Sequence, residues 1–254
     1  AMLSAAGIRT ESGLLETEAR ELNRGFLSRI ERGRPFVRLK CAASLDGKTA
    51  LSDGLSQWIT GEAARHDVQI LRAESCAVLT GIGTVLADDP QLNVRAFPTL
   101  RQPLRIVLDS RLRLPPTAKL LADPASPVLL LTAVPPEKYP AALAAVPHLD
   151  ILTVPAADGR ISLPAALTLL AERGIGELLV EAGATLCGAF LQSDLADEIV
   201  LYQAGKILGG NARSLFDLPE NPAALQQPAS WQTRSVAILD GGDLKQVLRK
   251  KEAV

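Results

Sequence analysis

Short apolar segments alternate with helical segments from residue 36 onward, and this alternation limits the fold more than any other feature of the sequence. Helical periodicity predicts helices over Leu163–Arg173 and Ala184–Gln192, and over an earlier segment that Thr60 caps at its N-terminus. The predicted strands are Phe36–Ala43, Ala77–Thr80, Leu104–Leu108, Val128–Leu131, Ile151–Val154, Glu177–Val180 and Glu198–Tyr202. Continuous apolar strands separated by helices indicate a largely parallel sheet that helices cover on both faces.

The two ends of the chain depart from this alternation. Trp231–Leu239 and Leu244–Leu248 predict a two-stranded hairpin joined by an Asp-Gly-Gly turn, which makes the sheet mixed. Near the other end, apolar residues at helical spacing predict a helix that ends at Gly33. We therefore expect an N-terminal extension over residues 1–33 and one α/β domain over residues 34–254.

The composition excludes several classes of protein. The formal net charge of −1 over 254 residues argues against a nucleic-acid surface, which needs a basic excess. No apolar run has the length of a membrane span. Cys41, Cys76 and Cys187 form no close pair, which fits a reducing cytoplasm and offers no zinc spacing. His66 and His148 lack the neighbours of a metal site or a catalytic triad. We expect a cytoplasmic protein without a metal, bound neither to nucleic acid nor to a membrane.

Polar residues interrupt the first strand and the segment that follows it. Lys40 lies within an apolar strand, where a cation costs desolvation unless it has a partner or a function; snorkelling at a sheet edge is the structural alternative. Ser56 and Trp58 precede a helix, where backbone amides attract an anion and an indole can stack on a flat ring. Arg72 lies further along that helix, and a surface ion pair is the commoner role of such an arginine.

Two glycine-containing turns follow buried strands. In the first, Gly83 lets a ligand approach the backbone, and the following Asp88-Asp89 pair either caps a turn or handles a proton. In the second, Glu181 ends a strand and Gly183 opens a helix, an arrangement that suits a pyrophosphate. Neither turn is diagnostic by itself, because short glycine turns are common.

Taken in order, the motifs of the chain are much more specific than any one of them. The succession is LKCAASLDGKTA, GLSQWIT, DVQILRAE, GTVLADDPQLNVR, RIVLDS, LLVEAGATLCGAFL and KILGG. From about Arg34 to the C-terminus it resembles the reductase domain of the bifunctional riboflavin-biosynthesis deaminase–reductase family. The resemblance implies a three-layer α/β fold like that of dihydrofolate reductase. Its sheet is mixed and mostly parallel, with helices on both faces and a C-terminal antiparallel hairpin.

The resemblance also implies the site residues. It places the catalytic groups at Lys40, Asp88 and Glu181, beside the reacting ribose carbon. The implied substrate contacts are Ser56, Arg72, Leu92, Arg95 and Glu181. The implied cofactor contacts are Ala42, Trp58, Thr84, Asp88, Ser110, Gly183, Ala184, Thr185, Leu186, Cys187, Gly188 and Ala189. Arg111, next to Ser110, is our own hypothesis, from charge and position, for a cation that binds the 2′-phosphate of the cofactor.

The activity that the resemblance implies is the NADPH-dependent reduction of 5-amino-6-(5-phosphoribosylamino)uracil to 5-amino-6-(5-phosphoribitylamino)uracil in riboflavin biosynthesis. Two alternatives stay open at this point. One is a reductase of the same fold that acts on the still-aminated pyrimidine or on a pteridine. The other is a non-catalytic nucleotide-binding module. Because family members commonly self-associate, we also expect a homo-oligomer, either a dimer or a tetramer.

The N-terminal stretch AAGIRTESGLLETEARELNRGFLSR resembles the end of the family's deaminase domain and the helix that connects it to the reductase. The deaminase needs a His-x-Glu and a Pro-Cys-x-x-Cys pattern to bind zinc, and the sequence has neither. We therefore expect no deaminase activity and no zinc, and a chain that represents a fragment, the reductase part, of a bifunctional enzyme.

Overall fold

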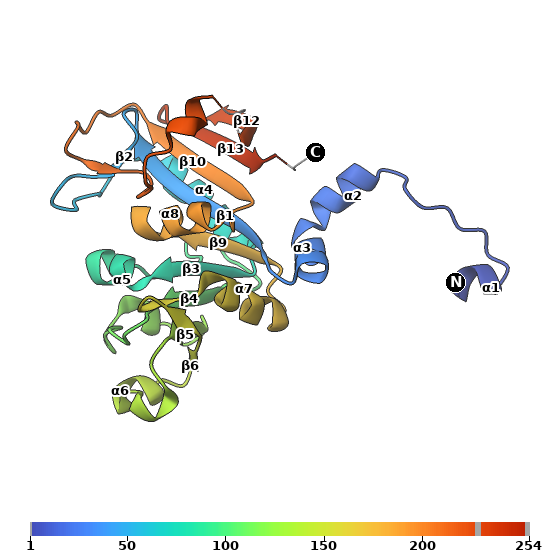
Figure 1. Cartoon of the computed structure of the whole chain (residues 1–254), viewed down its shortest axis with the longest axis horizontal. Helices are drawn as coiled ribbons and strands as arrows, with labels where there is room; N and C mark the ends of the chain where they lie inside the picture. The colour runs from blue at the N-terminus through green and yellow to red at the C-terminus, as the bar shows by residue number, and fades with distance from the viewer. Residues whose placement is uncertain (1, 227–229, 252–254) are drawn as a thin grey trace.

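The computed structural model describes residues 2–226 and 230–251, and a nine-stranded sheet forms its centre (Figure 1). The strands lie in the order β12-β13-β10-β1-β9-β3-β4-β5-β6. Their bounds, in that order, are Trp231–Ile238, Leu244–Lys250, Glu198–Ala204, Phe36–Ser44, Glu177–Glu181, Ala77–Gly81, Leu104–Leu108, Val128–Thr132 and Leu149–Thr153. Neighbouring strands from β10 to β6 are parallel, whereas β13 is antiparallel to both β10 and β12. This sheet confirms the predicted fold class.

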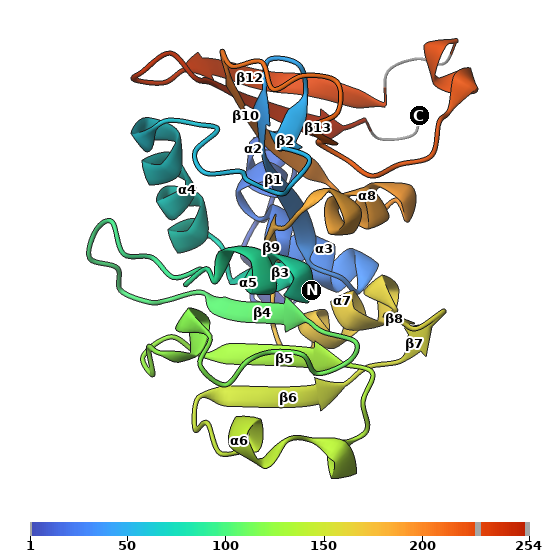
Figure 2. The same ribbon diagram turned by 90° about the vertical axis from the view of Figure 1, so that its left-hand side faces the viewer.

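Helices cover both faces of the sheet (Figure 2). They are α4 (Glu62–Glu74), α5 (Ile82–Asp88), α6 (Ala141–Ala144), α7 (Leu163–Glu172) and α8 (Ala184–Gln192), with short 3-10 helices at Lys119–Leu121, Pro136–Lys138 and Pro222–Leu225. In Figure 2, α4 lies on one side of β1 and β9, and α7 and α8 lie on the other. Within residues 2–226 and 230–251, no helix is both long enough and apolar enough to cross a membrane.

Side chains alternate between the two faces along each strand, and this alternation decides where the polar residues point. Val37, Leu39 and Cys41 of β1 belong to the core that also contains residues of α7 and α8. On β9, Leu179 belongs instead to the core that contains residues of α4. Lys40, between Leu39 and Cys41 on β1, therefore lies on the α4 face, as does Glu181, two residues after Leu179.

Some secondary-structure elements differ from the sequence prediction, because contacts with distant parts of the chain determine them. The prediction that Thr60 caps α4 is wrong: the N-cap is Gly61, whose backbone N–H donates to Asp243 Oδ2 at 2.6 Å. The segment after β3 forms α5, where only a glycine turn was predicted. Two small strand pairs were also missed, because segments this short carry no periodic pattern. They are β2 (Lys48–Ala50) with β11 (Arg213–Ser214), and β7 (Ala156–Ala157) with β8 (Arg160–Ile161).

The N-terminal extension contains α1 (Met2–Ala5), α2 (Glu16–Leu22) and α3 (Arg24–Arg32), and Figure 1 shows α1 far from the sheet. Asn23 separates α2 from α3, so the single helix predicted there is in fact two. The helix α3 packs closely on the domain, since a Cβ added to Gly25 would lie 3.0 Å from the backbone of Gly176.

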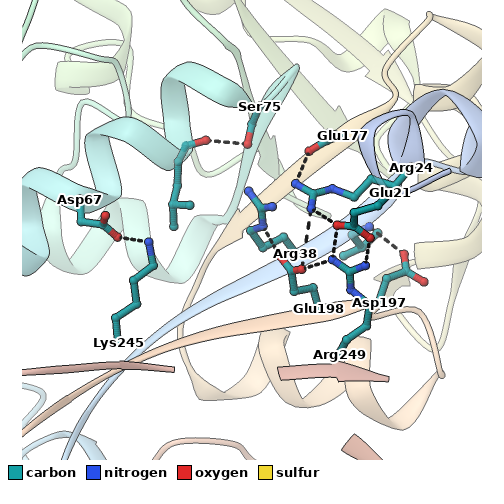
Figure 3. A network of polar contacts seen from close by, with 12 residues as sticks. Glu21, Arg24, Arg38, Asp67, Ser75, Glu177, Asp197, Glu198, Lys245 and Arg249 are labelled. Carbon is teal, nitrogen blue, oxygen red and sulfur yellow. Dashed lines mark hydrogen bonds and ion pairs between the residues drawn. The ribbon is translucent and has the colours of Figure 1, made fainter. Parts of the chain in front are cut away.

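A buried ionic network fastens this extension to the sheet (Figure 3). Glu198 of β10 is 2% exposed and accepts from Arg38 Nε at 2.5 Å and from Arg249 Nη2 at 2.6 Å. Arg249 also pairs with Glu21 of α2, and Arg24 of α3 lies 4.0 Å from Glu198. Burial acts to raise the pKa of Glu198, but its arginine neighbours outweigh burial and hold that pKa below its usual range. The network therefore joins α2 and α3 to three strands of the sheet.

Candidate active site

A cavity of about 1080 Å³ opens at the carboxyl ends of β1, β9, β3 and β4. This is the edge of a parallel sheet at which ligands usually bind. The predicted site residues on its wall are Lys40, Ala42, Ser56, Trp58, Arg72, Thr84, Asp88, Leu92, Arg95, Ser110, Glu181, Gly183, Ala184, Thr185, Leu186, Cys187 and Ala189. Arg95 and Glu181 thus face the same cavity. Among the residues that the structure describes, Gly188 and Arg111 do not line it.

Glu181 lies at the end of β9 between two cations. Lys40 of β1 is its direct neighbour in the sheet register. From α4, Arg72 Nε donates to Glu181 Oε1 at 2.5 Å, and Arg72 Nη2 donates to Oε2 at 2.9 Å. Burial acts to raise the pKa of Glu181, but the charge and hydrogen bonds of Arg72, with a smaller effect of Lys40, hold it below its usual range. Glu181 is therefore an ionised carboxylate that can accept a proton or orient a hydroxyl group.

The two predicted substrate arginines occupy different environments. Arg72 is buried, and besides Glu181 its Nη1 donates to the carbonyl oxygen of Asn93 at 3.1 Å. Its donors are largely used within the protein, so its main effect is to position Glu181. The guanidinium of Arg95 has no hydrogen bond or ion pair with any residue that the structure describes, while its backbone N–H donates to Gln69 at 3.0 Å. Arg95 is thus a cation on the cavity wall that is available to bind an anion.

The loop between β2 and α4 contributes Ser56 and Trp58 to the wall. Trp58 is 61% exposed, and the guanidinium carbon of Arg65 lies 4.5 Å from the centre of its ring. Arg65 is itself held by a 2.9 Å hydrogen bond to the carbonyl oxygen of Thr60. A cation stacked in this way fixes the indole, which remains exposed enough to stack on a second ring.

The N-terminus of α8 opens toward the cavity. Gly183 is the N-cap and has no side chain, and the first helical hydrogen bond runs from the Cys187 N–H to the Gly183 carbonyl. The amides of the residues between them have no partner inside the helix. A Cβ added to Gly183 or to Gly83 would meet no protein atom within 4 Å, so both backbones border open space. Free amides beside an open backbone fit the pyrophosphate of a dinucleotide.

Gly188 serves packing on the far side of the same helix. A Cβ at this position would lie 2.3 Å from the carbonyl oxygen of Asp217, so α8 approaches that backbone as closely as glycine allows. Cys187, one residue earlier, is buried and its Sγ donates to the carbonyl oxygen of Ala182 at 3.4 Å. The run from Gly183 to Ala189 therefore divides into a cavity-facing turn and a packing face.

The carboxyl end of β4 and the helix α5 complete the wall. Asp88 is the last residue of α5 and is exposed, whereas Ser110 follows β4 and its Oγ accepts from the N–H of Ile161 at 3.2 Å. Over the described parts of the chain, no group of three or more His, Cys, Asp or Glu side chains is placed to hold a metal ion.

Several cations on the wall were missed in the sequence analysis. They are Arg65, Lys119, Arg160 and Arg213. Lys119 pairs with Asp89 at 3.6 Å, and Arg213 extends from β11 over Gly54, where an added Cβ would lie 3.1 Å from its Nη2. These residues lie in segments without a motif, and the fold alone brings them to the cavity. In the sequence, their positive charge is the one feature that could have identified them as candidates for binding an anionic ligand.

Comparison with known proteins identifies the family of the chain. The model of the RibD C-terminal domain family matches residues 35–239. The riboflavin biosynthesis protein RibD of Escherichia coli strain K12 is 42% identical over 229 residues, which cover 85% of this chain and 61% of that protein. The corresponding protein of Haemophilus influenzae is also 42% identical, over 96% of this chain and 66% of its own length. The chain thus spans less than two thirds of these relatives.

Solved structures show the same relationship. The structure of Acinetobacter baumannii RibD matches with a TM-score of 0.86 and 41% identity, covering 98% of this chain and 67% of that one. A Thermotoga maritima protein described as a diaminohydroxyphosphoribosylaminopyrimidine deaminase/5-amino-6-(5-phosphoribosylamino)uracil reductase matches with a TM-score of 0.82 and 30% identity, covering 98% and 66%. On the matched residues and the shared fold, the chain belongs to the RibD C-terminal domain family.

Proposed function

We propose that this chain reduces 5-amino-6-(5-phosphoribosylamino)uracil to 5-amino-6-(5-phosphoribitylamino)uracil with NADPH, as a step of riboflavin biosynthesis. The observation that carries the proposal is the ionised Glu181, held between Lys40 and Arg72 in a cavity that also contains the open N-terminus of α8. One half of the cavity thus suits a sugar with acidic and basic partners, and the other suits a dinucleotide. The name of the Thermotoga maritima relative supports the choice of substrate.

Substrate binding is assigned to Arg95 and Ser56. The free guanidinium of Arg95 would bind the 5′-phosphate of the ribose, since charge-assisted hydrogen bonds from arginine match phosphate geometry. Ser56 would donate a further hydrogen bond, and Trp58 would stack on the flat pyrimidine or nicotinamide ring. Arg72, with its donors committed to Glu181 and Asn93, acts as a positioning residue.

The reaction begins with opening of the ribose ring. The bond between C1 and the ring oxygen breaks, the ring oxygen gains a proton, and the exocyclic nitrogen loses one as it forms an imine with C1. In this step Lys40 would donate the proton to the ring oxygen, and the Glu181 carboxylate would accept the proton from nitrogen. Asp88, exposed at the end of α5, is a further carboxylate on the cavity wall and would assist in this proton transfer. When bound, NADPH would supply the hydride that reduces C1, and the imine nitrogen would regain its proton from Glu181.

The cofactor would be held mainly by backbone. The amides after Gly183 would bind the pyrophosphate, while Ala42, Thr84 and Ser110, which line the same cavity, would contact the rest of the cofactor. With its nicotinamide at the end of β1, the dinucleotide would extend along the strand order β1-β9-β3-β4 toward Ser110.

The test is a turnover assay that follows loss of the reduced nicotinamide. The purified chain is offered the phosphoribosylamino-uracil, its still-aminated precursor and dihydrofolate, each with NADPH and with NADH. We expect the chain to oxidise NADPH with the phosphoribosylamino-uracil and with neither of the other two substrates. We also expect no deamination of the precursor. If the still-aminated precursor or dihydrofolate were reduced faster, that compound would be the substrate and the proposed activity would be wrong. Cofactor binding without turnover on any of the three would identify a nucleotide-binding module.

Self-association and location belong to the same proposal. We propose a homodimer or homotetramer of this chain, because β12 forms the edge of the sheet and exposes Val236 (58%) and Ile238 (77%). The mass in solution, measured by light scattering, tests this state. A cytoplasmic location is supported by the free cysteines Cys41, Cys76 and Cys187, which persist in a reducing compartment.

A further inference from the structure

The cavity extends past α8 to the end of β4, and Arg160 lines it there. Arg160 begins β8 and pairs with Ala157 of β7. The next residue, Ile161, is buried (7% exposed) and donates its N–H to Ser110 Oγ at 3.2 Å. The hairpin that carries Arg160 is therefore fastened to the end of β4, next to the serine that the cofactor is expected to contact.

Arg160 differs from two other cations on the cavity wall, Lys119 and Arg65, in that no partner for its side chain lies among the described residues. Lys119 is paired with Asp89 at 3.6 Å, and Arg65 is stacked on Trp58. Arg160 is exposed and, within residues 2–226 and 230–251, forms neither an ion pair nor a side-chain hydrogen bond. An unpaired guanidinium on the wall of a cavity is available to an anionic group of a ligand.

Arg111, the cation that the sequence suggested for this role, is placed differently. It follows Ser110 directly but does not line the cavity. Its backbone N–H faces the carboxylate of Asp109 at 3.4 Å, in a turn in which that carboxylate also accepts from the N–H of Leu114 at 2.8 Å. The chain therefore turns around Asp109 and carries Arg111 away from the cavity wall.

A dinucleotide bound as proposed above would bring its adenosine ribose close to Arg160. With the pyrophosphate at the N-terminus of α8 and the nicotinamide beside Lys40 of β1, the other half of the molecule would extend toward β3 and β4, which follow β9 in the sheet. Leu108, Leu163 and Leu186 line that end of the cavity and offer an apolar surface to adenine. Arg160 stands beside this surface with a positive charge.

We propose that Arg160 binds the 2′-phosphate of the adenosine ribose and thereby makes this chain prefer NADPH over NADH. The proposal rests on the proposed function, of which it is a refinement. A guanidinium presents paired N–H donors that match two phosphate oxygens, whereas the 2′-hydroxyl of NADH offers no charge to it. The residue therefore discriminates between the cofactors without contacting the reacting atoms.

The experiment measures binding by calorimetry, so that it needs no substrate and no turnover. NADP⁺ and NAD⁺ are titrated into the wild-type chain and into Arg160→Gln, Arg160→Lys and Arg111→Gln variants, with 2′,5′-ADP and 5′-AMP as fragments of the same half. Arg160→Gln is expected to raise the Kd for NADP⁺ and for 2′,5′-ADP on the order of 10- to 100-fold. The Kd for NAD⁺ and 5′-AMP should change less than about twofold, and Arg160→Lys should restore part of the loss.

The matched control is Arg111→Gln, which removes a neighbouring charge that lies off the cavity and should leave every Kd unchanged. A wild-type preference for NADP⁺ that survives in Arg160→Gln, or one that Arg111→Gln abolishes, overturns the assignment of Arg160 and leaves the proposed function standing. Equal wild-type affinity for NADP⁺ and NAD⁺ overturns it as well. If the wild-type chain binds neither nucleotide, the proposed function falls together with Arg160. Circular dichroism confirms that each variant is folded.

Discussion

At the scale of single residues, the site depends on how Arg72 is used. A lone helical arginine suggested either a surface ion pair or a substrate contact, and the structure shows a buried bidentate pair with Glu181. The sequence could not distinguish these outcomes, because the partner lies on a strand that is distant in the chain. In contrast, the sequence identified Lys40 as a cation within an apolar strand and Glu181 as a carboxylate at the end of another. The parallel register places the two residues side by side.

Replacing Arg72 tests this positioning role. Arg72→Gln leaves the Glu181 carboxylate buried without its main partner, which costs on the order of 3–5 kcal/mol of stability. The pKa of Glu181 should rise, because the charge that holds it low is gone, and the acid limb of the kcat profile should move to higher pH. Thermal unfolding and a pH–rate series measure the two effects. Affinity for ribose 5-phosphate should change little, and a large loss of that affinity would return Arg72 to the substrate contacts.

Replacing Arg95 should instead weaken substrate binding and leave stability unchanged. Arg95→Gln removes the free guanidinium that binds the sugar phosphate, so KM for the substrate should rise about 10- to 100-fold. The Kd for NADPH and the melting temperature should stay close to the wild-type values, since no ion pair with a described residue is broken. Steady-state kinetics and calorimetry give these quantities. Equal losses of substrate and cofactor affinity would contradict a phosphate-specific role.

Lys40 is expected to act in the chemical step. Lys40→Met keeps an unbranched side chain but removes the proton donor, so kcat should fall by on the order of 10²- to 10⁴-fold. NADPH binding should be retained, because Lys40 lies on the α4 face and away from the amides of α8. Single-turnover measurements with saturating cofactor test this directly. A normal rate would exclude Lys40 from the mechanism.

At the scale of elements, two glycines of one helix should behave differently. Gly183→Val puts a side chain into the open space before α8 and should raise the Kd for NADPH about 5- to 100-fold, with little effect on stability. Gly188→Ala instead forces α8 away from the backbone of Asp217 and should cost about 1–3 kcal/mol of stability. Calorimetry and thermal unfolding of both variants separate the effects. Equal effects on binding would show that the turn and the packing face act as one unit.

The helices and strands that were predicted correctly are those whose apolar residues recur at clear helical or strand spacing. The helix α8 has the bounds predicted for it, and the strands of the sheet were found within a few residues of their ends. The pairs β2–β11 and β7–β8 were missed, because two- or three-residue strands are stabilised by the contacts that the fold brings to them. For the same reason Arg160 and Arg213, which lie on these pairs, were not recognised as part of the site.

At the scale of the whole molecule, the network around Glu198 makes stability depend on pH. The pKa of Glu198 is lowered in the folded chain, and that of Glu21 falls from 4.5 to about 2. Groups with a lowered pKa stabilise the fold fully above their ordinary value and lose this contribution as the pH falls through the folded value. The free energy of unfolding should therefore decrease as the pH falls below about 4.5.

The Glu198→Gln variant checks that assignment. It leaves Arg38 buried without a charged partner, so it should lose on the order of 3–5 kcal/mol at neutral pH. Its stability should then fall less steeply in acid than that of the wild type, because one of the titrating carboxylates is gone. Denaturant unfolding at a series of pH values measures both slopes. Parallel slopes would mean that other carboxylates cause the acid sensitivity.

The wall of the cavity has a consequence for how the chain folds. It draws on β1, α4, α5, β4, β8, α8 and β11, so segments from nearly the whole length of the domain must be in place before a ligand finds its contacts. A partly folded chain would have no affinity for the nucleotide, and added nucleotide would shift the equilibrium in favour of the complete fold alone. The amount of nucleotide bound at saturation would therefore measure the fraction of molecules that are completely folded.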